Sequence, residues 1–460
     1  MAKKPEDKQQ AGNDVSDAIR SVLKPIQRIA LDQKSASVLL LICAVAALII
    51  ANSPFAQRYE EIVETPIGLL LGDQQFSMSL RHWINDGFMA LFFFVIGLEI
   101  KRELLVGELR KPSQSIPVIA AALGGMLVPA LFFAALNMGE DTLRGWAIPM
   151  ATDTAFAIGV LALLGKRAPF GLTAFLLALA IIDDMGAVLV IALFYTGSLD
   201  PFYLSTAAAT LAMLFIANRL GVRHPAFFFL GGGLVWFATL NSGVHATLAG
   251  VLVALTVPAR PTHSPKYFAR KSRNLISKFI RRVRNSNEDN PVLAEQRQHR
   301  LVEELQQTAK EATTPLQLWE RTLEHPVALL VLPVFALVNA GIPLSSFSVA
   351  GFFQSPLALG IVLGLVLGKL IGISAGTWLV IKLGWGRLPH GMELHHTFGL
   401  GLLAGMGFTM SIFIAGLGFE QQPESLIVAK AGIILASLLA GLGGYLWLRF
   451  TGPDPASESN

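Results

Sequence analysis

Cysteine and charge are both scarce in this chain. Cys43 is the single cysteine among 460 residues, which excludes an intrachain disulfide and a cysteine-ligated metal cluster. Charged residues make up 15% of the chain and hydrophobic residues 53%, whereas soluble globular domains carry about 25% charged residues. This composition argues against a soluble protein and for a membrane protein.

A cleavable export signal is also lacking. Residues 1–35 are polar and contain neither the apolar run nor the small-residue cleavage site of a signal peptide. We therefore predict that 1–35 is a cytoplasmic segment and that the first apolar block, 36–53, serves as its own insertion signal.

Long apolar blocks fill most of the remaining chain. A helix needs roughly 20 apolar residues to cross the hydrocarbon layer, and several blocks reach that length with little or no charge. They predict an all-α polytopic membrane protein with about twelve transmembrane helices, eight within 36–258 and four within 326–450. The approximate spans are 36–53, 81–104, 116–137, 145–165, 170–196, 203–219, 224–240, 242–258, 326–344, 356–382, 396–418 and 424–449.

Lysine and arginine gather in alternate loops of this arrangement. Such an excess marks the cytoplasmic side of an inner-membrane protein, and the intervening loops are mainly acidic. The alternation predicts a multi-pass protein of the bacterial inner membrane with both termini, including the tail 451–460, in the cytoplasm. It also accounts for the net charge of +4 without a nucleic-acid partner. The basic loops are 1–35, 101–111, 166–167, 219–223, 259–325 and 382–387.

Two loops are long enough to have structure of their own. The pattern within residues 54–80 predicts an external hairpin that turns at Gly72-Asp73. Residues 259–325 form a cytoplasmic insertion, and within it 266–284 combines apolar residues at helical spacing with many basic residues. This pattern is typical of a helix lying on anionic lipid, although a solvated linker explains the same charges.

Two adjacent aspartates lie in the middle of the fifth span. Asp183 and Asp184 occur in ALAIIDDMGAVLV, and charges at such depth are costly and are usually functional. Mutual repulsion and desolvation favour a bound proton on such carboxyls, while their hard oxygens suit a small cation such as Na⁺ or Li⁺. We therefore expect H⁺ and Na⁺ to compete for one site that needs no cofactor.

A buried lysine provides a structural alternative for this pair. Lys369 lies in VLGLVLGKLIGI and could form a salt bridge with one aspartate, or release its own proton because burial disfavours its charge. One lysine neutralises one carboxylate, so a salt bridge does not explain both Asp183 and Asp184.

Two spans carry residues that interrupt helices. Residues 148–154 contain both Pro149 and Asp153, and residues 401–411 contain three glycines. Broken helices persist in a membrane only where they are buried in protein or line a polar cavity, and the free helix ends attract charged partners such as Asp153. The breaks fall in the fourth and eleventh spans, which predicts inverted-topology repeats around a binding site. Packing through small residues could by itself explain the glycines.

At these residues the sequence resembles the NhaA-type sodium/proton antiporters. The resemblance runs from about residue 80 to 418 and continues into the last span. The matching stretches are FFFVIGLEIKRELLVGELR, ATDTAFAIGVLALLG, AIIDDMGAVLVIALFY, SGVHATLAGV, VNAGIPL, LGKLIGI and GLLAGMGFTMSIFIAGLGF.

This resemblance implies electrogenic exchange, with more protons entering than sodium ions leaving, and roles in pH and sodium homeostasis. It implies Asp184 as the primary ligand, Asp183 as the partner of Lys369, and Thr152 with Asp153 at the crossing of two broken helices. It also implies a homodimer held partly by residues 54–80.

The resemblance further suggests residues that sense pH. Glu99 and Glu103 match the family's pH-sensing funnel, and His245 matches a histidine linked to the pH response. The spacing differs at WERTLEHPVALL, which holds Glu320, Glu324 and His325. Without the resemblance, these residues could be only a charged helix face and a hydrogen-bonded core histidine. The candidates are Glu99, Glu103, His245, Asp86, Glu320 and His325.

Other functions are compatible with acids in a membrane. An intramembrane aspartyl protease could use Asp153 with Asp183 or Asp184, but its GxGD motif is absent from the sequence. A symporter for an organic anion conflicts with the buried carboxylates, and a cation channel would need a ring of acids around an open path. We therefore expect a transporter rather than an enzyme.

Overall fold

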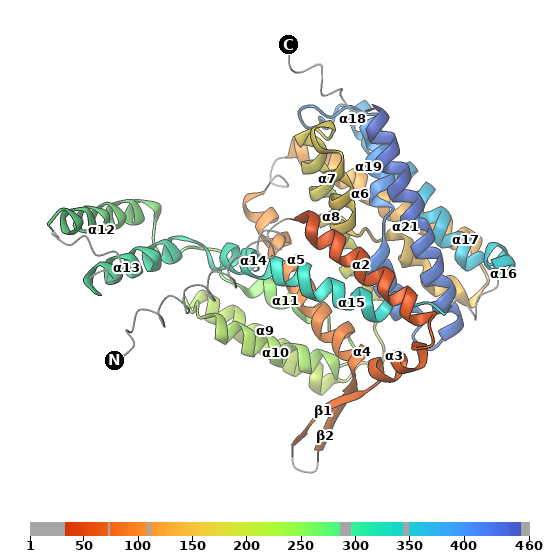
Figure 1. Ribbon diagram of the computed structural model, residues 1–460, viewed down its shortest axis with the longest axis horizontal. Coiled ribbons are helices and arrows are strands. Elements are labelled where there is room, and N and C mark those ends of the chain that lie inside the picture. The colour runs from red at the N-terminus through yellow and green to blue at the C-terminus, as the bar shows by residue number, and fades with distance from the viewer. Residues whose placement is uncertain (1–32, 72–73, 108–111, 286–295, 344–348, 452–460) are drawn as a thin grey trace, which may run out of the picture. The chain divides into compact units, whose positions relative to one another are not determined.

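The computed structural model describes residues 33–71, 74–107, 112–285, 296–343 and 349–451 and is helical apart from one hairpin (Figure 1). The expectations for most of 1–35, for the hairpin turn at 72–73 and for nearly all of the tail 451–460 lie outside the described residues. The chain divides into two compact units. The first comprises Met1–Phe92, Gly107–Gly197 and His325–Asn460, and the second comprises Phe93–Val106 and Ser198–Glu324.

The first unit holds most of the apolar helices. Helix α17 shows how sequence sets a helix start. Ser355 is its N-cap and accepts the Ala358 N–H, and Pro356 follows as the first helical residue. Its elements are α2 (Gln33–Ala51), α3 (Ala56–Val63), β1 (Pro66–Leu71), β2 (Gln74–Ser79), α4 (Leu80–His82), η1 (Trp83–Phe88), α6 (Pro112–Leu136), η3 (Asp141–Met150), α7 (Thr154–Leu163), η4 (Gly165–Arg167), α8 (Phe170–Phe194), η5 (Val327–Val331), α15 (Leu332–Asn339), α16 (Val349–Gln354), α17 (Pro356–Leu363), η7 (Gly364–Gly368), α18 (Lys369–Lys382), α19 (His396–Ala404), α20 (Phe408–Gly418) and α21 (Pro423–Thr451).

The second unit combines apolar helices with most of the segment 259–325, which the sequence predicts to be a cytoplasmic insertion. Asp200 caps the start of α9 by accepting the N–H groups of Phe202 and Tyr203, and α9 packs on α10. The elements of this unit are α5 (Met89–Val106), α9 (Pro201–Arg219), α10 (Pro225–Leu240), α11 (Leu248–Thr256), α12 (Pro265–Asn285), α13 (Gln296–Ala312) and α14 (Pro315–Pro326), of which α5 begins and α14 ends in the first unit.

Six helices in the described part of the chain are long and apolar enough to cross a membrane, or up to nine if each of three bent pairs is one span. The chain is thus polytopic, but the count of twelve is not reproduced by length and composition. The predicted span 242–258 is helical only over Leu248–Thr256, which is too short to cross alone. The span predicted at 326–344 starts earlier, because one apolar helix runs from Pro315 to Asn339, so the end of the predicted insertion 259–325 belongs to this helix.

The expected hairpin and both expected breaks are present. Strand β1 pairs antiparallel with β2, with Pro66 opposite Ser79. The chain bends by 43° between η3 and α7 and by 44° between α19 and α20. A further bend of 117° separates residues Ser35–Ala51 of α2 from α3, which the sequence analysis did not predict.

Glycines bring α6 and α18 into close contact. A Cβ atom added to Gly372 would collide with the carbonyl oxygen of Gly124, and one added to Gly376 would collide with that of Ala120. Small residues let helix backbones approach closely in membranes, where dispersion contacts replace the hydrophobic drive. This contact fixes the position of Lys369, the first residue of α18.

Replacing Gly372 by alanine tests this packing. We expect a loss of about 1–3 kcal/mol of stability, the usual cost of overpacking a tight contact, seen as a lower midpoint of thermal unfolding in detergent. The matched control is Gly416→Ala on α20, where an added Cβ meets nothing within 4 Å. Equal midpoints for the two variants would contradict the close contact.

Candidate ion-binding site

Both mid-span aspartates are buried on α8. Asp183 is 1% exposed and Asp184 is 8% exposed. Because consecutive helix residues point about 100° apart, the two carboxyl groups border neighbouring sectors of the helix rather than one direction. Desolvation at this depth makes each negative charge costly unless a partner compensates it.

Lys369 provides that compensation for Asp183. Its Nζ lies 2.5 Å from Oδ2 of Asp183 and 2.9 Å from Oγ1 of Thr152, and the ion pair is completely enclosed, with side-chain exposures of 0% for both residues. The lysine directly follows the π-helical turn η7. Such turns are frequent at functional sites, and this one ends where the lysine enters the site.

Thr152 connects this ion pair to a broken helix. Its hydroxyl oxygen lies 2.8 Å from Oδ2 of Asp183 and 2.9 Å from the carbonyl oxygen of Ala404. The hydroxyl has one proton and can donate to one of these acceptors at a time. Ala404 is the last residue of α19, so the negative end of that half-helix lies beside Thr152 and the Lys369 ammonium.

Asp153 caps two half-helices at once. Oδ1 accepts the N–H of Phe156 at the start of α7, at 3.1 Å. Oδ2 accepts the N–H of Thr409 at the start of α20, at 3.0 Å, together with the Thr409 hydroxyl. One carboxylate thereby meets the positive ends of both half-helices that follow the breaks.

Backbone and side-chain hydrogen bonds also join the two breaks directly. The N–H of Asp153 donates to the carbonyl oxygen of Met406 at 2.7 Å, and the hydroxyl of Ser411 donates to the carbonyl oxygen of Ile148 at 2.8 Å. The two breaks therefore form one hydrogen-bonded crossing, in which side chains and backbone pair several of the backbone groups that the breaks free, as a membrane interior requires.

One carboxylate oxygen of the buried ion pair accepts no hydrogen bond in the described part of the chain. Oδ1 of Asp183 is buried and has no hydrogen-bond partner among the described residues. A buried carboxylate oxygen without a donor is costly, and a proton or a small hard cation would satisfy it. The candidate ligand atoms named here are carboxylate and hydroxyl oxygens of Asp183 and Thr152. Such hard oxygens fit Na⁺ or Li⁺ rather than a soft metal.

The structure brings together Thr152, Asp153, Asp183 and Lys369, with Asp184 next along α8. Sequence reasoning missed the roles of Thr409 and Ser411 at the crossing. Both occur in the glycine-rich stretch 401–411, and a hydroxyl residue close after a helix break is the signal that could have pointed to them.

Three pH-sensing candidates form a cluster in the second unit. Arg102 on α5 lies 2.8 Å from Glu320 and 3.0 Å from Glu103, with Glu99 at 3.9 Å. The charged groups are partly exposed, with the Arg102 side chain at 30%. The single arginine can therefore neutralise one of the three carboxyl groups.

The other candidates lie elsewhere. His245 is in the second unit, in the turn before α11, and is part-buried. Asp86 is part-buried in η1, and His325 is part-buried in α14. Asp86 and His325 belong to the first unit, whereas the Arg102 cluster lies in the second.

Comparisons with known proteins match nearly the whole chain. The family model described as Na⁺/H⁺ antiporter 1 matches residues 27–448. Na(+)/H(+) antiporter NhaA 1 of Saccharophagus degradans is 45% identical over 433 residues, covering 94% of this chain and 93% of the relative. The NhaA 1 protein of Pseudoalteromonas atlantica is 49% identical over 414 residues, covering 90% and 87%.

A third relative, the NhaA protein of Oleidesulfovibrio alaskensis, is 46% identical over 431 residues and covers 94% of this chain and 95% of the relative. These matches confirm the resemblance inferred from the motifs, and the family is one of transporters rather than enzymes. The chain belongs to the Na⁺/H⁺ antiporter 1 family, together with the relatives named NhaA.

Proposed function

We propose that this protein is an electrogenic Na⁺(Li⁺)/H⁺ antiporter that exports sodium in exchange for protons and serves pH and sodium homeostasis. The observation that carries the proposal is the enclosed Lys369–Asp183 pair with a second buried aspartate beside it. Full-length similarity to relatives named Na(+)/H(+) antiporter supports it.

Exchange follows from competition at the carboxyl groups. A sodium ion bound at Asp184, with Asp183 as the second carboxyl of the site, needs ionised oxygens, whereas a proton neutralises the same oxygens. Occupation by one therefore excludes the other. If the site is open to one side at a time, protons entering from outside displace sodium, and sodium from the cytoplasm displaces protons.

Electrogenic exchange requires more protons than sodium ions per cycle. Two carboxyl groups, or one carboxyl group and the ammonium of Lys369, can carry two protons in the proton-loaded state. A single sodium ion replacing both would move a net positive charge inward. Thr152 links this change to the half-helix α19, because its hydroxyl lies within reach of both Asp183 and Ala404.

The crossing provides the scaffold for alternating access. Asp153 offsets the positive ends of α7 and α20, and Lys369 with Thr152 lies near the negative end of α19. We propose that the two broken spans are the fourth and eleventh of twelve, in inverted repeats, so that one repeat can rock against the other around the site.

We further propose that the Arg102 cluster regulates exchange by pH, with Asp86, His245 and His325 as additional sensors. Three carboxyl groups around one arginine change their net charge as they titrate. The alternative is a static charged helix face.

The remaining proposals concern assembly and location. We propose a homodimer formed partly through the β1–β2 hairpin, in a bacterial inner membrane with both termini in the cytoplasm. The Ile67 side chain on strand β1 is 47% exposed, which suits pairing with a second copy.

Asp184→Asn is expected to abolish exchange almost completely, because the amide cannot bind a proton and is a weaker cation ligand. The measurement is Na⁺-dependent proton movement in proteoliposomes under a set pH gradient. Asp200→Asn, which changes an exposed helix cap, is the control. Sodium-driven exchange that persists in Asp184→Asn removes the site assignment.

Asp183→Asn is expected to lower stability by about 3–5 kcal/mol, because it leaves the Lys369 ammonium buried without its counter-charge. Thermal unfolding in detergent at pH 7 measures the loss. The double variant Asp183→Asn with Lys369→Met should recover much of it, since neither position of the pair then carries a charge. Lys382→Gln, at the exposed end of α18, the helix that begins at Lys369, is the control variant. An unchanged midpoint in Asp183→Asn would contradict the ion pair.

Glu320→Gln is expected to move the exchange activity along the pH axis while keeping the maximal rate, because it changes the charge around Arg102 and leaves the ion site intact. Exchange rates between pH 6 and pH 9 test this. Glu303→Gln on α13, which is exposed, should leave the profile in place. A lowered maximal rate with an unmoved profile would argue for a purely structural cluster.

A further inference from the structure

Helix α12 concentrates positive charge without any acidic residue. Eight of its 21 residues are lysine or arginine, whereas α13 mixes three basic residues, Arg297, Arg300 and Lys310, with three glutamates. The two helices pack on each other within the second unit (Figure 1). The positive charge of this helical hairpin therefore belongs to α12.

Part of the apolar side of α12 is buried within the helical hairpin. Leu275 is 5% exposed and Ser272 is 9% exposed, and Thr308 on the facing helix α13 is fully buried. Part of the apolar side of α12 is thus covered by α13. Ile276 and Ile280 remain 47% and 59% exposed, at the border between the covered side and the basic side.

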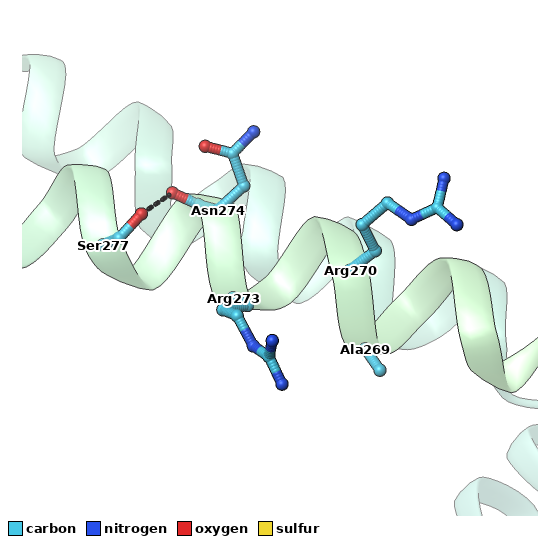
Figure 2. Close-up of a pocket in the computed structure, with 5 residues that line it drawn as sticks. All are labelled: Ala269, Arg270, Arg273, Asn274 and Ser277. Atoms are coloured by element: carbon cyan, nitrogen blue, oxygen red, sulfur yellow. Dashed lines mark hydrogen bonds between the residues drawn. The ribbon is translucent and has the colours of Figure 1, made fainter.

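The basic side is open to solvent. Arg270, Arg273, Asn274 and Ser277 line a surface hollow of about 490 Å³ together with Ala269. Figure 2 shows the two guanidinium groups extending away from the helix in different directions, while the Ser277 hydroxyl is tied to the Asn274 backbone carbonyl. The guanidinium forks match the oxygens of phosphate groups.

These cations have no internal counter-charge. Among the described residues, no carboxylate forms an ion pair with Lys266, Arg270, Lys271, Arg273, Lys278 or Arg281. The Lys271 ammonium lies over the Tyr267 ring, at 5.6 Å from its centroid. A surface of uncompensated cations attracts a polyanionic partner.

Short connections hold the base of the hairpin to apolar helices. The carbonyl oxygen of Glu311 accepts the N–H groups of Thr262 and His263 at 2.9 and 3.1 Å, and Leu316 donates to the carbonyl oxygen of Pro258 at 3.1 Å. The chain enters α12 soon after the apolar α11 and leaves α13 directly into the apolar helix Pro315–Asn339. The polyanionic surface nearest to such a tether is the bilayer itself.

We propose that the basic side of α12, from Lys266 to Arg281, docks on the anionic phospholipid headgroups of the membrane that the protein spans. Arg270 and Arg273 bind headgroup phosphates, and Ile276 and Ile280 enter the interface beside them. The apolar residues covered by α13 stay out of the lipid. The attachment is electrostatic, and therefore weakens as salt rises, because screening shortens the reach of surface charges to about 8–10 Å at 0.10–0.15 M.

A single fluorescent label at position 280 tests the docking in the full-length protein. The variant Cys43→Ser with Ile280→Cys carries an environment-sensitive dye and is reconstituted in nanodiscs of phosphatidylcholine, with or without phosphatidylglycerol. We expect a blue-shifted emission only with phosphatidylglycerol, and loss of the shift in 1 M NaCl. A label at Gln306→Cys on the exposed side of α13 should not respond.

Charge variants separate docking from unspecific changes. Arg270→Gln with Arg273→Gln should abolish the shift, whereas Arg300→Gln on α13 should keep it. The same emission in both lipids overturns the proposal. A response to single-stranded DNA in phosphatidylcholine nanodiscs, without a response to phosphatidylglycerol, overturns it in favour of a nucleic-acid surface. None of these readouts depends on ion exchange, so the result stands apart from the proposed antiport.

Discussion

The cost of burying charge governs the first unit. Asp183 and Lys369 are completely enclosed, and each ion would be strongly unfavourable alone in a medium of low dielectric constant. Each therefore needs the other as its counter-charge. A structural salt bridge still does not account for every buried acid group. Oδ1 of Asp183 lacks a hydrogen-bond partner among the described residues, and a second acid, Asp184, follows in the chain.

The broken helices follow from the same constraint. Each break frees backbone groups and leaves helix ends with partial charges, and these are matched by side chains already at the crossing. Asp153 meets two positive ends and Thr152 meets a negative one. The glycine contacts between α6 and α18 hold the lysine helix in place, so packing and electrostatics specify one position for Lys369.

The second unit handles charge differently. The Arg102 cluster and the basic side of α12 are partly exposed, where solvent screens each charge. A buried ion pair and partly exposed charges therefore belong to different units of the chain.

The sequence alone determined the membrane class, the buried acids and both breaks. Asp153, Asp183, Asp184 and Lys369 stand out because charge in a long apolar block has few explanations, and Pro149 and the glycines of 401–411 mark where helices cannot continue. The motifs also identified the family. The number of spans could not be predicted as well from sequence. Helix α11 is short, and one apolar helix runs from Pro315 to Asn339, across the end of the predicted insertion.

Only the tertiary structure decided which groups meet. Neighbouring residues of a helix differ by about 100° in direction, so one-dimensional spacing could not establish from the residues alone that Lys369 contacts Asp183, or that Thr409 shares Asp153 with Phe156. It also could not show that α13 covers part of α12, because amphipathic periodicity identifies an apolar side without naming what lies against it. Contacts between distant segments depend on packing, and packing is set by the whole chain.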